Sequence, residues 1–346
     1  MKDDARFSVD RRWPEFPQTS PGAQMRSARG GLLFGMDNPR HQYFRRMLIP
    51  EFTAKRIEPL RPTVQRVVDE LLDGMAARPG PVDLVDAFAV RILSKVLCQM
   101  LGLPYEDHEF FRQNVKGRLT ITTGEDKAKR DHDELTSYLG ELFRRRELEP
   151  SDDLIGRLAR DRINTGQLSR EEAVGLIEVV IAGGYAATGG TIGLGTLLLL
   201  EHPEQIPVIR DGDAKEVAIA VEELIRYVNS THLGRRRVAL EEVEIGGVTI
   251  QPGEGLIAAD ALANRDPRMF DDPDALNLRR DPNPHLVFGI GTHHCFGAYL
   301  AKVVLETAFP SLFRRFPGLR LAVPMSELEF LPDATVYTVK EIPVLW

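Results

Sequence analysis

The sequence is poor in cysteine and shows no signal for export. Its 346 residues include two cysteines, Cys98 and Cys295, which lie in very different contexts. This usage argues against a disulfide framework and is typical of a reducing compartment, so we expect a cytoplasmic protein. The first residues are charged and contain prolines, and we expect neither a signal peptide nor a membrane anchor there.

The sequence also lacks an excess of positive charge, internal repeats and low-complexity tracts. Its formal net charge is −7, so we expect no nucleic-acid partner. Hydrophobic residues make up 43% and charged residues 27% of the chain, which is normal for a globular protein. Flavin and nicotinamide motifs are absent as well, because the glycines at 289, 291 and 297 do not have the G-x-G-x-x-G spacing.

Helical patterns dominate what is present. The first forty residues are broken by proline and glycine and predict a loop. Residues 243–260 predict a hairpin with Gly246 and Gly247 in its first turn, and the last twenty residues predict irregular β structure. Apolar periodicity predicts helices at roughly 39–52, 55–76, 83–101, 106–116, 127–146, 152–163, 169–201 and 214–228. The predicted fold class is therefore mainly α with a smaller β region.

One predicted helix, residues 169–201, is long and almost uncharged. Ser169 and Glu172 predict a capping box at its start, and residues 173–200 contain one charge, Glu178. A transmembrane span is the alternative, but seven glycines, Glu178 and the lack of flanking basic and aromatic anchors oppose it. We therefore expect a buried helix and no membrane. The paired glycines indicate either that something bulky approaches the helix closely or that the helix kinks.

The segment HLVFGIGTHHCFGAYLAK places Cys295 among glycines, and four interpretations are open. A zinc site lacks ligands, because His293, His294 and Cys295 are consecutive and cannot all reach one ion. A cysteine nucleophile needs a positioned base, which an adjacent histidine can supply. An inert buried cysteine suits Cys98 in its apolar helix better than a residue surrounded by glycine. The fourth interpretation is an axial ligand of haem iron.

The haem interpretation agrees best with the surroundings of Cys295. A thiolate on a glycine-permitted turn can reach a flat macrocycle without steric conflict. The residues that follow repeat apolar side chains with a helical period, so the cysteine lies just ahead of a helix N-terminus. The N–H groups and the dipole there favour thiolate over thiol and temper its electron donation.

The same segment resembles the haem-binding loop of the cytochrome P450 family, F-G-x-G-x-H-x-C-x-G-x-x-L-A. The matching residues are Phe288, Gly289, Gly291, His293, Cys295, Gly297, Leu300 and Ala301. The resemblance implies haem b (iron protoporphyrin IX) as cofactor, with Cys295 as the proximal ligand of the iron. It also implies the P450 fold, in which the cysteine loop and a long distal helix sandwich the haem.

Other segments resemble further parts of this family. Glu223 and Arg226 match its E-x-x-R pair, and Arg280 matches an arginine that completes a buried ion network with them. The residues that match contacts to the haem propionates are His41, Arg45, Arg237 and His293. The residues that match the lining of the substrate pocket are Ser230, Thr231, His232 and Tyr337.

The predicted distal helix departs from the family pattern in its proton relay. Tyr185 occupies the acid position and Ala186 the alcohol position. Alanine has no proton to give, and tyrosine is neutral at pH 7. Thr188 lies two residues on, about 200° around the helix, and can replace Ala186 only through a bulge. Alternatively, Ala186 merely makes room for a bulky substrate.

A second departure is length. The family normally has several dozen residues ahead of the segment RFSVDRRWPEFP, which here lies almost at the start. We therefore expect a single P450 domain over residues 1–346 that lacks the usual N-terminal helix and first strands. Such a domain would have an exposed sheet edge and a more open substrate channel.

The resemblance implies a monooxygenase-type oxidoreductase that oxidises a small organic molecule in specialised metabolism, by hydroxylation or by oxidative ring closure or coupling. Electrons would come from a ferredoxin and its reductase or another donor, docked near Lys302, Arg314 and Arg315. Because of Tyr185 and Ala186, a substrate hydroxyl with ordered water can be the proton source. The alternatives are a peroxide-driven peroxygenase and a haem-binding carrier, recruiter or pseudoenzyme without turnover.

Overall fold

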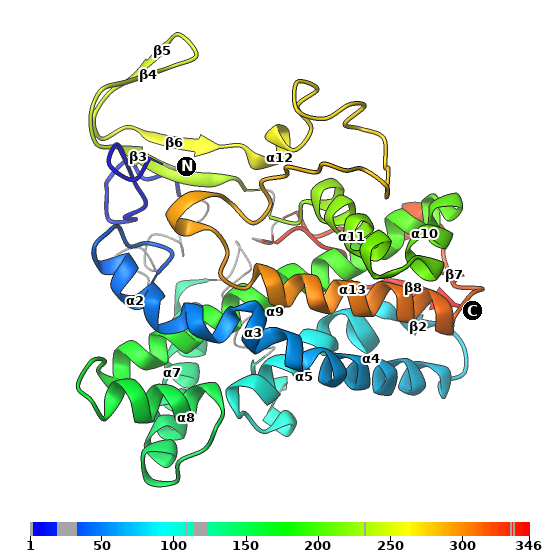
Figure 1. The fold of residues 1–346 in the computed structure, drawn as a ribbon, viewed down its shortest axis with the longest axis horizontal. Helices are drawn as coiled ribbons and strands as arrows, with labels where there is room; N and C mark the ends of the chain where they lie inside the picture. The colour runs from blue at the N-terminus through cyan, green and yellow to red at the C-terminus, as the bar shows by residue number, and fades with distance from the viewer. Residues whose placement is uncertain are drawn as a thin grey trace.

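The computed structural model describes residues 3–18, 33–107, 109–111, 113, 124–231, 233–332, 334 and 336–346. In this part of the chain helices predominate, and small antiparallel sheets accompany them, as expected for the fold class. Most helices pack together in one body, and strands β3 and β6 lie along one side of it (Figure 1).

The helices vary greatly in length. They are α2 (Arg40–Leu48), α3 (Ala54–Ile57), α4 (Arg61–Ala76), α5 (Val90–Leu101), α7 (Glu125–Leu148), α8 (Leu154–Leu158), α9 (Arg170–Glu201), α10 (Ile206–Asp211), α11 (Ala214–Val228), α12 (Asp260–Ala263) and α13 (Ala298–Arg315).

The strands are short. They are β1 (Phe7–Ser8), β2 (Val82–Asp83), β3 (Arg235–Ala239), β4 (Val243–Ile245), β5 (Val248–Ile250), β6 (Gly255–Ala258), β7 (Arg320–Leu321) and β8 (Pro343–Leu345). One sheet has the order β1-β3-β6, a second has the order β2-β8-β7, and β4 and β5 form a separate hairpin. That hairpin projects from the body at the upper left of Figure 1.

Helix α9 is the central helix of the core. It packs against α5, α7 and α13, and its N-terminal capping box is present as predicted. The Ser169 hydroxyl accepts the Glu172 N–H at 3.1 Å, and the Glu172 carboxylate accepts the Ser169 N–H at 3.0 Å. The helix is long and apolar enough to cross a membrane by composition, but 65% of its most apolar window is buried inside the protein. Helix α9 is therefore a helix of the protein core.

The glycines of α9 allow other chain segments to approach closely. A Cβ on Gly184 would lie 3.1 Å from a Leu97 methyl, and one on Gly190 would lie 3.3 Å from the Tyr337 carbonyl. One on Gly195 would lie 2.7 Å from the Phe309 ring. The helix nevertheless continues without interruption from Arg170 to Glu201. Of the two explanations that the sequence left open, close approach is therefore confirmed.

Several predicted helices are interrupted. The predicted helix 55–76 breaks at Glu58–Leu60, where Pro59 lies in a 3₁₀ turn. The predicted helix 83–101 begins as strand β2 and passes through a π turn at Val85–Ala89 before α5 starts. The predicted helix 152–163 consists of α8 and a π turn at Ala159–Ile163. Most of the predicted helix 106–116 lies outside the described residues.

The β region also differs in part from the prediction. The hairpin turns at Gly246 and Gly247 as expected, but it ends at Ile250. Strand β6 pairs instead with β3, which precedes it in the chain. Residues 7–8, predicted as loop, form β1 on the other edge of β3. These errors share one cause, since pairing between distant segments leaves no local pattern.

Candidate functional site

The loop that contains Cys295 ends at the first residue of α13. The Cys295 N–H donates to the Phe288 carbonyl at 2.8 Å and so closes the loop. Gly289 has a φ of 71° and Gly291 a φ of 78°, which glycine adopts readily. A Cβ on Gly297 would lie 3.9 Å from the Cys295 sulfur. The loop thus presents the sulfur with little side-chain bulk around it.

The surroundings of Cys295 combine two opposed influences on its thiol. The residue is exposed on one side, but the atoms packed around it desolvate the sulfur, and this burial raises the pKa of Cys295 above its ordinary value. The N–H groups of Gly297 and Ala298 and the cations Arg235 and Arg45 act in the opposite direction. These donors and charges are of the kind that stabilises a thiolate.

Two histidines and an arginine form a buried cluster near this loop. The His41 and His293 rings lie 4.0 Å apart, and His41 is 1% exposed. Burial, with the Arg45 charge, lowers the pKa of His41 to about 4. Burial, with the charges of His41 and Arg237, lowers the pKa of His293 to about 3. Arg237 is 8% exposed and donates to the Arg236 carbonyl at 2.8 Å.

This cluster fits the two propionates of haem. Within the described ranges, no carboxylate forms an ion pair with His41, Arg237 or His293, and the His41 Nδ1 has no hydrogen-bond partner. The low pKa values leave both histidines neutral at pH 7, where they can donate N–H groups, so the buried charge is that of Arg237. A buried charge without a counter-ion is costly, and a propionate beside Arg237 would supply one. Arg45 has a different contact, because its Nη2 donates to the His294 carbonyl at 2.6 Å and holds the cysteine loop.

The residues predicted for the proton relay lie in the middle of α9. Ala186 is half-buried and Thr188 is buried. Tyr185 is also part of α9. Because α9 is regular α-helix throughout, no bulge moves Thr188 to the position of Ala186. The Thr191 hydroxyl donates to the Ala187 carbonyl at 2.9 Å.

Two residues predicted for the substrate pocket lie together beside α9. The Tyr337 N–H donates to the Ser230 carbonyl at 2.8 Å, and the Ser230 hydroxyl lies 3.5 Å from the Ala187 carbonyl. Thr231 is half-buried next to them. His232 was predicted for the same pocket and lies outside the described residues.

Glu223, Arg226 and Arg280 form one hydrogen-bonded network. The Arg226 Nε donates to Glu223 at 2.7 Å and the Arg280 Nε at 3.1 Å, and both Glu223 and Arg226 are fully buried. Asn277 adds its N–H, and Asn283 adds its side-chain amide at 3.0 Å. The carboxylate is therefore saturated with donors, which a buried charge requires.

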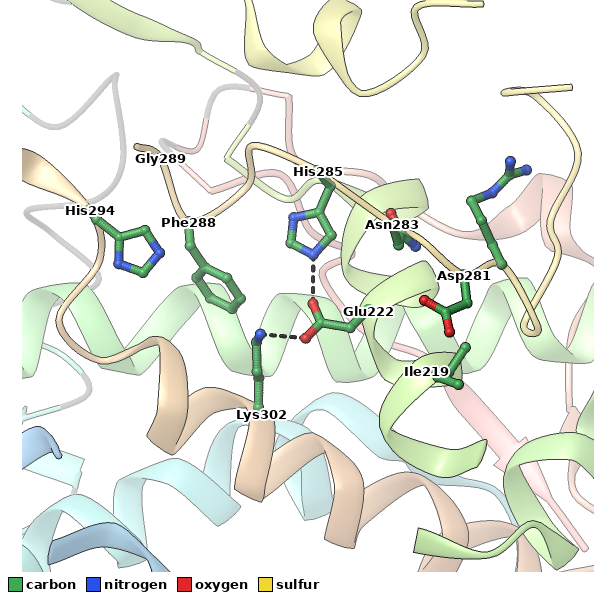
Figure 2. Close-up of a pocket in the computed structure, with 10 residues that line it drawn as sticks. Ile219, Glu222, Asp281, Asn283, His285, Phe288, Gly289, His294 and Lys302 are labelled. Atoms are coloured by element: carbon green, nitrogen blue, oxygen red, sulfur yellow. Dashed lines mark hydrogen bonds and ion pairs between the residues drawn. The ribbon is translucent and has the colours of Figure 1, made fainter. Parts of the chain in front are cut away.

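A cavity of about 280 Å³ lies between α11, α13 and the segment that leads into the cysteine loop. The Glu222 carboxylate in its wall binds both His285 Nε2, at 2.8 Å, and the Lys302 ammonium (Figure 2). The same ammonium lies 5.5 Å from the centre of the Phe288 ring. The residues that line the cavity are Ile219, Glu222, Arg280, Asp281, Asn283, His285, Phe288, Gly289, His294 and Lys302.

The three cations predicted for a docking face all lie on α13. Lys302 lies in the second turn of α13, and Arg314 is twelve residues further on, which is about 18 Å along the helix axis. Arg314 donates to the Arg210 carbonyl at 2.6 Å, and Arg315 pairs with Asp73 at 3.0 Å. A docking interface of ordinary size can span this separation, so the docking face stays a prediction.

Sequence reasoning missed several residues near the site. Glu222 and His285 belong to the cavity of Figure 2, and Arg235 and Asp260 form an ion pair beside the cysteine loop. Each of these contacts joins positions far apart in the chain. A pattern in one segment therefore could not reveal them, although Glu222 is the direct neighbour of Glu223 in the E-x-x-R match.

Comparison with known proteins agrees with this geometry. The family model for cytochrome P450 matches residues 217–324. Cytochrome P450-SOY of Streptomyces griseus is 41% identical over an alignment of 346 positions, which covers 99% of this chain and 82% of that protein. Pentalenic acid synthase of Streptomyces avermitilis is 41% identical, over 100% of this chain and 85% of its own length.

Solved structures give the same result. Cytochrome P450 TxtC, described in sequential aliphatic and aromatic thaxtomin hydroxylation, has a TM-score of 0.94 at 38% identity. The alignment covers 99% of this chain and 88% of that one. The expected fold is thereby confirmed, with its helical body and small sheets. The chain belongs to the cytochrome P450 family and is an oxidoreductase of the monooxygenase type.

Proposed function

We propose that this chain is a haem-thiolate monooxygenase in which Cys295 binds the iron of haem b. The observation that carries the proposal is the pairing of a glycine-lined thiol at a helix N-terminus with the buried cluster of His41, Arg237 and His293. Bound haem supplies the activation of dioxygen, and thiolate ligation favours O–O cleavage.

The protein's own residues would bind, orient and enclose the cofactor. His41, Arg45, Arg237 and His293 would donate to the propionates. Arg45 would also keep the loop in place through the His294 carbonyl. Phe288, Gly289 and Gly297 would shape the proximal surface without crowding it. Helix α9 would cover the opposite face, where Ser230, Thr231, His232 and Tyr337 would line the substrate pocket.

The substrate in this proposal is a small organic molecule of specialised metabolism, and the reaction is hydroxylation, oxidative ring closure or coupling. The names of pentalenic acid synthase and of the thaxtomin-hydroxylating TxtC support such a role. We further propose that residues 1–346 act as one P450 domain. A ferredoxin with its reductase would supply electrons in the cytoplasm.

The proposal is tested by the carbon-monoxide difference spectrum of the reduced protein. Wild type should show the strongly red-shifted Soret band of thiolate ligation. Cys295→His should lose that band while it still binds haem, and Cys98→Ser should keep it, because Cys98 is buried in the core away from the loop. A red-shifted band in Cys295→His, or its absence from wild type, would overturn the proposal.

The proton relay is the second part of the proposal. Ala186 has no hydroxyl, and α9 has no bulge that would move Thr188 into its place, so the substrate hydroxyl and ordered water would deliver protons. The combined change Tyr185→Asp and Ala186→Thr should then increase product per electron on a substrate analogue that lacks the hydroxyl. An unchanged yield on that analogue would contradict a missing relay.

The alanine also favours a second candidate function, a peroxygenase, because peroxide arrives with its own protons and electrons. Turnover of one substrate with the ferredoxin system and with hydrogen peroxide separates the two functions. If only the assay with the ferredoxin system gives product, the monooxygenase is supported. If only the assay with hydrogen peroxide gives product, the peroxygenase is supported. A protein that shows the thiolate band but gives no product in either assay would fit a haem-binding carrier, recruiter or pseudoenzyme.

A further inference from the structure

Asp260 is a buried carboxylate at the start of α12. Its side chain is 0% exposed, and neither carboxylate oxygen has a hydrogen-bond partner within the part of the chain that the structure describes. The Arg235 Nε lies 3.3 Å from Oδ2. Burial raises the pKa of Asp260, and the Arg235 charge acts against this. Since an unpaired buried charge is costly, Asp260 strongly favours a guanidinium beside it.

Arg235 connects this carboxylate to the cysteine loop. Its Nη2 donates to the Val287 carbonyl at 2.5 Å, one residue before Phe288. A Cβ on Gly289 would lie 3.9 Å from the Arg235 Nε, so the guanidinium lies against the first glycine of the loop. Its charge is therefore fixed on the proximal side of the site.

The single turn of α12 anchors two consecutive residues of the same segment. Asn264 follows Asp260 by four positions, which places both on one helix face. The Asn264 Oδ1 accepts the Leu286 N–H at 2.7 Å, while Asp260 acts on Val287 through Arg235. The segment that leads into the cysteine loop is thus held at the Leu286 N–H and at the Val287 carbonyl.

We propose that Arg235, held by the buried Asp260, is a positioning residue that fixes the Val287 carbonyl and sets the reduction potential of the iron bound by Cys295. This inference rests on the proposed haem-thiolate function. Reduction adds one negative charge at the iron, and a fixed cation nearby favours that reduced state. The Arg235 charge therefore raises the midpoint potential and eases the arrival of the first electron.

The test is a spectroelectrochemical titration of the haem-loaded variants. Arg235→Gln keeps a hydrogen-bond donor for Val287 but removes the charge. At a fixed potential its ferric-to-ferrous ratio should rise on the order of tenfold, which is about 59 mV for one electron. Arg235→Lys keeps the charge and should stay near wild type. Arg236→Gln is the matched control, because its guanidinium lies instead over Phe16, and its potential should not change.

A second variant keeps the proposal testable if Arg235→Gln does not retain haem. Asp260→Asn leaves Arg235 charged but without its counter-ion, so the midpoint should move to more positive values. A potential in Asp260→Asn equal to or below that of wild type would overturn the inference. So would equal potentials in Arg235→Gln and wild type, or a shift in Arg236→Gln of the same size as in Arg235→Gln.

The wild-type spectrum separates the two proposals. If carbon monoxide gives the red-shifted band and the variants leave the potential unchanged, only the role of Arg235 fails. If wild type lacks that band, the haem-thiolate function itself fails.

Discussion

Glu222 shares its carboxylate between His285 and Lys302 in the wall of the cavity. Burial opposes its ionisation, but the hydrogen bonds and charges of these two partners outweigh burial, and the pKa of Glu222 lies below its ordinary value. Because the pKa of Glu222 is lower in the folded than in the unfolded protein, its ionisation stabilises the fold when the pH is above the unfolded pKa. This contribution to the free energy of unfolding is lost as the pH falls through the folded pKa.

We therefore predict that Glu222→Gln lowers the free energy of unfolding at pH 7. The difference from wild type should shrink as the pH falls below about 4.5. Urea denaturation of both proteins across this range measures the effect. Glu329→Gln is the control, because its ion pair with Lys340 is about 60% exposed on both sides and should contribute little. An equal difference at every pH would contradict the linkage.

At the scale of the element, the glycines of α9 allow neighbouring side chains to pack closely against the helix. The Phe309 ring is fully buried and lies 2.7 Å from the Cβ that alanine would place at position 195. We predict that Gly195→Ala destabilises the protein by about 1–3 kcal/mol, although alanine is the better helix former. Denaturant unfolding monitored by circular dichroism gives the value.

Gly140→Ala in α7 is the matched control for this substitution. A Cβ at position 140 meets nothing within 4 Å, so only the helix propensity changes. Gly140→Ala should stabilise the protein by up to about 1 kcal/mol. If Gly195→Ala were also stabilising, the close contact between α9 and α13 would not constrain this position.

Elements with strong local signals could be predicted from the sequence. The limits of α9 and α11 follow from their caps and apolar periods, and both agree with the prediction within one residue. The turn of the β4–β5 hairpin follows from its glycine pair. The partner of β6, the π turns and the arrangement around α12 depend on distant contacts, and the sequence carries no local sign of them.

The site shows the same division. The glycine and histidine pattern predicts the Cys295 loop, since each residue there has a local backbone role. The Asp260–Arg235 pair and the Glu222 bridge could not be predicted, because their members come from separate segments and only packing brings them together.

At the scale of the whole molecule, Glu223 joins α11 to the long segment that precedes the cysteine loop. Its carboxylate binds Arg226 and Arg280, and Arg226 continues to the Asn264 and Pro273 carbonyls. We predict that Glu223→Gln costs about 3–5 kcal/mol, because it leaves buried guanidiniums without a counter-charge. The midpoint of denaturant unfolding and the fraction of haem retained should both fall.

Glu141→Gln on α7 is the comparison for this change. Glu141 and Arg144 form a pair that is more than half exposed on both sides, so its loss should cost less than about 1 kcal/mol. Similar losses from Glu223→Gln and Glu141→Gln would show that the buried network contributes no more than a surface pair.

The cysteine loop is held by residues from the N-terminal part of the chain. Arg45 reaches His294 across 249 positions, and Thr292 contacts Asp4 across 288. Such distant contacts form slowly, and a chain leaves the ribosome with its N-terminus first. The N-terminal partners must therefore wait until the cysteine loop itself has been made. Closure of this loop, and with it the capture of the cofactor, follows the formation of local structure in the segments made before it.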